Sequence, residues 1–196
     1  GHSHMLAEEL FFRAGGLARI VPMLHPPLML HESASAATQA ERDFDVVGEL
    51  LERYPMSGGD VLVVASNSGR NACPIELAMV AKERSVRTIA VLNSEHSAKW
   101  ASRHSSGKRL GDVVDLVIDN CGVEGDACVP LPGSGLFVGA TSTVTGCLIM
   151  QMIACRATEM LNAFGRQPEL YQSSNANHDE RNAALIAEHK QTNPHL

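Results

Sequence analysis

The chain is poor in aromatic residues and has no excess of basic ones. Aromatic residues make up 4% of the 196 positions, and Trp100 is the only tryptophan. Acidic residues outnumber lysine and arginine by 22 to 16, which gives a formal net charge of −6. A broad nucleic-acid surface needs a basic excess, so we expect no nucleic-acid partner. A small anion site is compatible with this charge, because a few local donors hold a phosphate.

Long apolar runs and a secretory signal are also lacking. No uninterrupted apolar run approaches the roughly 20 residues that span a bilayer, so we expect no membrane partner. The five cysteines are odd in number and show no CxxC spacing, which argues against a disulfide framework. These features together predict a cytoplasmic protein with reduced and mostly buried thiols.

Several catalytic signatures are missing. No GxGxxG follows a predicted strand and no GxSxG is present, which argues against a dinucleotide site and a serine hydrolase. Residues 105–109, SSGKR, lack the first glycine of a nucleotide P-loop and the Ser or Thr after its lysine. The nine histidines show no HExxH register, so we expect no metal and no cofactor.

The most informative stretch is residues 61–76, VLVVASNSGRNACPIE. Its β-branched start predicts a strand over 61–65 that is covered on both faces, and a helix follows over 75–84. In the turn between them, Gly69 allows close backbone approach, and Asn71 is a suitable helix N-cap. Serine hydroxyls and the N–H groups of residues 69–71 and of the helix start would then bind a dianion. The alternative is an ordinary turn whose serines only cap the helix.

The same pattern recurs further along the chain. A second buried strand over 86–92 precedes the polar residues 93–97, and a third strand is expected over 113–118. Strands that alternate with helices predict a parallel α/β sheet, whose ligands lie beyond the carboxyl ends of the strands. The two hydroxyl-bearing turns should therefore face one crevice.

Other elements are predicted from periodicity and breakers. We expect a strand over 18–24, a helix over 38–54, an irregular segment over 119–134, a short edge strand over 135–139 and a terminal helix over 179–190. The helix over 144–164 is apolar on most sides, so it should be buried or shared with another subunit. Residues 1–5 are either an expression remnant or a loop with Ser3 as the N-cap of a helix over 6–13.

These motifs resemble the SIS (sugar isomerase) family of phosphosugar-binding domains. SNSGRN at residues 66–71 resembles the family's SxSGxT phosphate loop, with Asn71 in place of the usual threonine. Ser94 and Ser97 resemble its second hydroxyl loop, and GHS at residues 1–3 resembles the end of its first loop, GxGxS. Together with GHSHMLAEELFFRAGGL and HSSGKRL, they are similar over nearly the whole chain to a bacterial SIS subgroup described as phosphoheptose-isomerase-like.

The resemblance implies a fold, a ligand and an assembly. It implies a flavodoxin-like, three-layer α-β-α sandwich with a five-stranded parallel sheet, a single SIS domain over residues 1–196. The family's opening helix and first strand are then missing before residue 1. It also implies a homodimer formed through helices, which binds a sugar phosphate. The residues carried over for phosphosugar binding are Ser3, Ser66, Asn67, Ser68, Gly69, Arg70, Asn71, Ser94 and Ser97.

Aldose–ketose isomerisation moves a proton through an enediol, so it needs a base and an acid. Glu8 or Glu9 could supply the base, although both could equally be solvated helix charges. His96 could act as the acid or bind a hydroxyl, or it could cap a helix or face solvent. The family's glutamate–histidine pair has no secure match here. A phosphosugar etherase or lyase, a non-catalytic sugar-phosphate sensor and a partner subunit therefore stay as alternatives.

Overall fold

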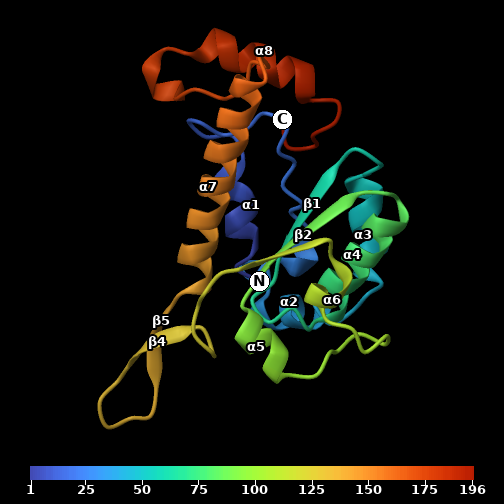
Figure 1. The fold of residues 1–196 in the computed structure, drawn as a ribbon, viewed down its shortest axis with the longest axis vertical. Coiled ribbons are helices and arrows are strands. Elements are labelled where there is room, and N and C mark those ends of the chain that lie inside the picture. The colour runs from blue at the N-terminus through green and yellow to red at the C-terminus, as the bar shows by residue number, and fades with distance from the viewer. The chain divides into compact units, whose positions relative to one another are not determined.

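The computed structural model describes residues 1–196, which form two compact units (Figure 1). Unit 1 contains residues 1–3 and 24–146, and unit 2 contains residues 4–23 and 147–196. The single domain over 1–196 stays a prediction. In chain order the elements are α1 His4–Leu10, η1 Pro26–Leu28, α2 Ala34–Ala40, α3 Val46–Arg53, β1 Val61–Ala65, α4 Ala72–Glu83, β2 Arg87–Leu92, α5 Ser94–Lys99, α6 Leu110–Val113, β3 Leu116–Asp119, β4 Ala127–Pro130, β5 Phe137–Ala140, α7 Ser142–Ala163, η2 Ser174–Ala176 and α8 Asp179–His189.

Unit 1 is built on a parallel sheet of three strands in the order β1-β2-β3. The predicted parallel α/β class is thus confirmed, but the prediction of a five-stranded sheet is wrong. Residues 18–24 form no strand, and Leu17 makes only an isolated bridge to Leu170 in unit 2. Pro22 lies inside that segment and has no N–H to donate to a ladder.

Burial differs strongly between the strands. The central strand β2 buries Thr88, Ala90, Val91 and Leu92, and α4 packs against it and β1. On the outer strands Val61 is 59% exposed and Leu116 is 53% exposed. The expected two-sided cover therefore holds for β2 and not for its neighbours.

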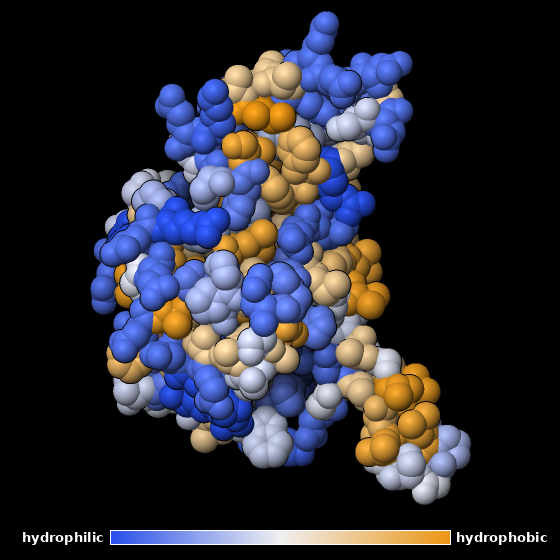
Figure 2. All heavy atoms as spheres, turned by 180° about the vertical axis from the view of Figure 1, so that it is seen from behind, coloured by the Kyte–Doolittle hydropathy of each residue, from blue (hydrophilic) through white to orange (hydrophobic).

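The segment from residue 119 to 140 is more regular than expected. β4 pairs with β5 as an antiparallel hairpin, and the edge strand expected over 135–139 belongs to it instead of the main sheet. Hydrophobic side chains gather on this hairpin (Figure 2), where Leu136 is 63% and Phe137 57% exposed. Because β4 has four residues and follows a glycine-rich stretch, its own sequence carries little strand signal.

The helix expected over 38–54 is broken into α2 and α3. Between them the Asp43 carboxylate accepts the Asp45 N–H at 2.9 Å, a local turn that competes with helical hydrogen bonding. The break leaves the Glu41 carbonyl to accept a hydrogen bond from the Cys73 N–H at 3.1 Å. Residues 41–45 are thereby tied to the start of α4.

Unit 2 consists of α1, most of the long helix α7, α8 and the segments between them. Its core includes Tyr171, whose ring meets Phe12 edge-on at a centroid distance of 4.8 Å.

By length and composition alone, α7 could cross a membrane, contrary to our expectation that no segment of the chain could. One such helix is weak evidence, because core helices of soluble proteins pass the same test. Only 17% of the most apolar stretch of α7 is buried. Of the two alternatives expected for this helix, burial within the protein is therefore wrong.

The cysteines are less buried than expected. Cys73 is buried, whereas Cys121, Cys128 and Cys155 are exposed. All five are free thiols in this structure.

Candidate functional site

The carboxyl ends of the three parallel strands meet at one edge of the sheet. Ala65 is in register with Val91, and Leu92 with Asp119, so the turns after β1, β2 and β3 begin side by side. The two hydroxyl-bearing turns therefore share this edge, and the crevice that they are expected to face stays a prediction. We call residues 66–71 the first turn and residues 93–97 the second turn.

A network of asparagines joins the two turns beneath this edge. The Asn93 N–H donates to the Asn67 carbonyl at 3.0 Å, and Asn120 Nδ2 donates to Asn67 Oδ1 at 2.8 Å. Asn93 Nδ2 reaches the Gly122 carbonyl at 2.7 Å. Asn93 and Asn120 are buried, and a satisfied buried network of this kind holds its backbone rigidly. Sequence reasoning missed both, although each directly follows a strand.

Gly69 shapes the first turn. Its φ of +57° is left-handed, and an added Cβ would lie 3.1 Å from Ser97 Oγ and 3.3 Å from Leu92. Both the backbone conformation and the close packing therefore require glycine here. Ser97 is buried, so it supports the turn from beneath.

The N–H groups expected to bind an anion are partly engaged within the protein. The Gly69 N–H donates to the Ser66 carbonyl at 3.0 Å, the Cys73 N–H donates to Glu41, and Pro74 has none. Asn71 occupies the N-cap position of α4 without a capping hydrogen bond from its side chain. The expected backbone cradle is thus smaller than the sequence predicted.

The Asn71 side chain bridges a cation and an anion instead. Its Nδ2 donates to Glu41 Oε2 at 2.8 Å, and its Oδ1 accepts from Arg103 Nη1 at 2.8 Å. Glu41 Oε1 lies 2.7 Å from the Gly1 nitrogen, which brings residues 1–3, including exposed Ser3, to the same corner. Sequence reasoning missed Glu41 and Arg103, because both reach the turn only through tertiary contacts.

The second turn has a different electrostatic environment. The Ser94 N–H lies 3.4 Å from Asp119 Oδ1, and the Cys121 N–H donates to the same oxygen at 2.9 Å. Burial alone would raise the pKa of Asp119, but hydrogen bonds from Cys121 and Ser94 outweigh it and hold that pKa below its usual value. Ser94 therefore stands beside a carboxylate, which disfavours a second phosphate contact there.

The three candidate catalytic residues belong to different units. His96 is half-buried in α5, and the Gly125 N–H approaches its Nδ1 at 3.5 Å. In unit 2, Gln151 Nε2 donates to Glu9 Oε1 at 2.8 Å, and Glu9 also pairs with Arg13. Glu8 is exposed on α1. Whether either glutamate faces the turns of unit 1 stays a prediction.

A contact between His104 and Glu76 holds the segment that follows Arg103 in place. Buried His104 places Nε2 at 2.8 Å from Glu76 Oε2 on α4, and its Nδ1 at 2.7 Å from Ser106 Oγ. The pair anchors the HSSGKRL segment against α4. Its role in the site is thus to hold a neighbouring loop in position.

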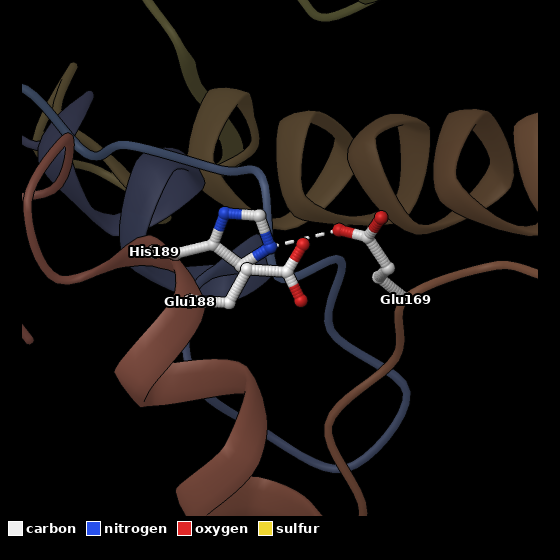
Figure 3. A group of neighbouring side chains, drawn as sticks. All are labelled: Glu169, Glu188 and His189. Atoms are coloured by element: carbon white, nitrogen blue, oxygen red, sulfur yellow. Dashed lines mark hydrogen bonds and ion pairs between the residues drawn. The ribbon is translucent and has the colours of Figure 1, made fainter.

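One group in unit 2 has side chains that could ligate a metal. Ligand atoms of Glu169, Glu188 and His189 lie within 4.8 Å of one another, with Glu169 facing the end of α8 (Figure 3). Arg19, however, donates two hydrogen bonds to Glu169 at 2.9 and 3.1 Å, and His189 Nε2 lies 2.8 Å from the same carboxylate. The guanidinium already supplies the positive charge, so the group works as an ion-pair network that ties α8 to residues 19 and 169.

Two hollows of the protein lie away from the turns. One of about 200 Å³ in unit 2 is bordered by Phe12, Tyr171 and Asn182, and one of about 310 Å³ in unit 1 is bordered by Lys82, Arg87 and Asp115. Neither contains a predicted site residue. The case for the site therefore depends on the chemistry of the turns.

Comparison with known proteins gives the class and then the family. Residues 1–93, which include the first turn and the start of the second, match the SIS domain model. UPF0309 protein lin2794 of Listeria innocua is 44% identical over 197 residues, which cover all of this chain and 80% of that protein. UPF0309 proteins of Thermoanaerobacter pseudethanolicus (Teth39_1980) and Geobacillus kaustophilus (GK1441) are each 40% identical over the whole chain, which covers 81% and 78% of them. The chain belongs to the UPF0309 family, within the SIS-domain class. An SIS domain supports binding of a carbohydrate derivative.

Proposed function

We propose that this protein binds a sugar phosphate on the first turn. The observation that carries the proposal is Ser68, whose half-buried hydroxyl has no hydrogen-bond partner within the protein. Ser66 Oγ accepts only a long contact of 3.3 Å from the Gly69 N–H, so its own proton remains to be donated. Two such hydroxyls in the turn before a 12-residue helix suit a phosphate, because the helix dipole adds positive potential.

The reaction that we assign to this site is aldose–ketose isomerisation. Glu8 or Glu9 would remove the proton next to the carbonyl, and His96 would serve the carbonyl oxygen. Gln151 and Arg13 orient the Glu9 carboxylate, which favours it over exposed Glu8 as a positioned base. Etherase or lyase chemistry would use the same proton abstraction, and a sensor would bind without turnover.

The test replaces Ser68 by alanine and measures binding of a panel of sugar phosphates by calorimetry. A hydrogen bond to a charged group contributes about 1.5–3 kcal/mol, so affinity should fall roughly 10-fold or more. The matched control is Ser105→Ala, which removes an exposed hydroxyl that makes no hydrogen bond in the structure. Unchanged affinity in Ser68→Ala, or equal binding of the unphosphorylated sugar, would contradict the proposal.

Turnover is measured on the same panel. Interconversion of an aldose phosphate and its ketose, with exchange of the transferred proton for deuterium, would support the isomerase. Release of the substituent from a phosphosugar ether would favour the etherase or lyase. Saturable binding with neither reaction would favour the sensor.

We also propose that α7 forms the homodimer interface. On this helix Leu148 is 61% exposed and Met152 is 63% exposed, one turn apart on the same face. Replacing both by glutamate should shift a dimer to a monomer in light scattering. A wild-type monomer, or recovery of the wild type only with membranes, would contradict the dimer. A cytoplasmic location and the absence of nucleic-acid and membrane partners also stay part of this proposal.

A further inference from the structure

Three arginines gather beside the first turn. Arg42 follows Glu41, Arg70 belongs to the turn itself, and Arg103 contacts the Asn71 side chain. We call them the arginine cluster. None of the three forms an ion pair, although the chain carries more acidic than basic residues. No carboxylate therefore contacts their guanidinium groups directly, and that of Glu41 reaches Arg103 only through the Asn71 side chain.

Arg70 and Arg103 are held together by hydrogen bonds with the backbone. The Arg103 N–H donates to the Arg70 carbonyl at 2.8 Å, and Arg70 Nε donates to the Ala101 carbonyl at 2.9 Å. These two bonds dock residues 100–103 onto the first turn. A guanidinium has five N–H donors, so one bond from each side chain leaves most of its donors for a ligand.

The electrostatics of the cluster are unfavourable without an anion. Burial lowers the pKa of Arg103, the nearby charges of Arg70 and Arg42 lower it further, and the Glu41 carboxylate opposes them only in part. Like charges that are kept together in this way cost free energy, and a bound anion removes that cost. The protein thus maintains a positive site that a ligand would stabilise.

Trp100 borders the cluster. It is 44% exposed, and the Arg70 guanidinium lies over its ring at 5.9 Å from the centroid. Lys99 lies at the same distance from the ring but is neutralised by its ion pair with Glu124. The ring therefore helps to orient Arg70 and places a stacking surface beside it.

We propose that the arginine cluster is a second anion subsite, and that the ligand is a sugar carrying two phosphoryl groups. One group binds the hydroxyls of the first turn and the other binds the guanidinium groups next to Trp100. The inference rests on the proposed function, since it deepens the ligand of that same site. Sugar bisphosphates and nucleoside-diphosphate sugars share this chemistry, and only the latter carry a base that can stack on the indole.

The fluorescence of Trp100 provides the test, because it is the only tryptophan of the chain. The probes are fructose 6-phosphate, fructose 1,6-bisphosphate and UDP-glucose, titrated into the full chain. We expect at least one doubly phosphorylated probe to bind roughly 10-fold more tightly than the monophosphate, in line with a second charge-assisted contact. Stronger quenching by UDP-glucose would identify the nucleotide sugar as the source, and tighter binding of the bisphosphate would identify the bisphosphate.

Two substitutions separate the subsites. Arg103→Gln should abolish the advantage of the doubly phosphorylated probe and weaken the monophosphate by a clearly smaller factor, and Arg103→Lys should restore part of the advantage. The matched control is Arg87→Gln, which removes an exposed arginine at the amino end of β2, away from the turns. Unchanged melting temperatures would show that each variant is folded.

The outcomes distinguish the two proposals. Equal affinity for all three probes, unaffected by Arg103→Gln, would overturn the second subsite, while the proposed function would stand if Ser68→Ala still weakened the monophosphate. A loss caused by Arg103→Gln with no effect of Ser68→Ala would keep the cluster and overturn the first turn as the phosphate site. Displacement of the bisphosphate by a short single-stranded oligonucleotide at lower concentration would show a general polyanion surface and overturn the inference.

Discussion

The two turns at the edge of the sheet follow the same strand–turn–helix pattern but have opposite electrostatics. Around the first turn, Ser68 has no partner and three unpaired arginines lie nearby. In the second turn, Ser94 lies beside the ionised Asp119. The first turn therefore suits an anion, and the second suits a neutral hydroxyl that can donate to a carboxylate.

The helices after the turns strengthen this contrast. The helix after the first turn, α4, has 12 residues, whereas α5 has six and the Asn93 side chain already caps it. Longer aligned helices present a larger partial positive charge at their start. A hydroxyl-bearing pattern thus indicates where a ligand binds, and the surrounding charges determine which part of the ligand goes to which turn.

The largest expected effect comes from Gly69→Ala, which changes the backbone geometry of the first turn. A left-handed conformation costs a non-glycine residue about 1–2 kcal/mol, and the new Cβ would also press on Ser97 and Leu92. We expect sugar-phosphate binding to become undetectable and the melting temperature to fall. Calorimetry and thermal unfolding measure the two effects.

The matched control is Gly107→Ala. Gly107 has a similar φ of +73°, but nothing lies within 4 Å of its added Cβ. It should show the backbone penalty in stability and keep its affinity for the ligand. Equal loss of binding in both variants would mean that the loss reflects general destabilisation and not the close packing of the first turn.

A smaller effect is expected for Asp119→Asn, which tests the charge of the second turn. Removing one negative charge near the site should raise the affinity for inorganic phosphate about 2–5-fold at low salt, since two charges at 4 Å interact by about 1 kcal/mol even in water. The gain should shrink as salt is added. Unchanged phosphate affinity at every salt concentration would show that the two turns do not differ in the way that we infer.

The pH dependence of stability accompanies this variant. Because the folded-state pKa of Asp119 lies below its ordinary value of 3.8, ionised Asp119 favours the folded state. That contribution is present above the ordinary value and is lost as the pH falls through the lowered one. The difference in melting temperature between the wild type and Asp119→Asn should therefore shrink in strongly acidic buffer.

An element could be predicted where its own residues carry the pattern that forms it, and was missed where it depends on a partner elsewhere in the chain. The strands β1 and β2 and the helices α4, α7 and α8 have strong apolar patterns, and sequence reasoning located them within a few residues. The hairpin strand β4 was missed, because a four-residue strand that ends in proline forms only against its partner. The break before α3 was missed because it depends on one carboxylate, that of Asp43, competing with the helix.

The candidate site was predictable in the same uneven way. Ser66, Ser68 and Gly69 form a contiguous motif at the end of a clear strand, so their position followed from the sequence. Arg103 could not be assigned to the turn, because it lies 32 residues beyond its contact Asn71. The carboxylate of Asp119 was equally hidden, since its relation to Ser94 depends on the register of β3.

The break between α2 and α3 has a consequence for how the site assembles during folding. The start of α4 obtains a hydrogen-bond acceptor from Glu41, far back in the sequence, and Asn71 obtains another from the same residue. Contacts between distant residues form after the intervening chain has closed into a loop, whose entropy must be overcome first. The first turn should therefore reach its binding conformation late on the folding pathway, and an isolated peptide with the complete strand–turn–helix motif should bind phosphate poorly.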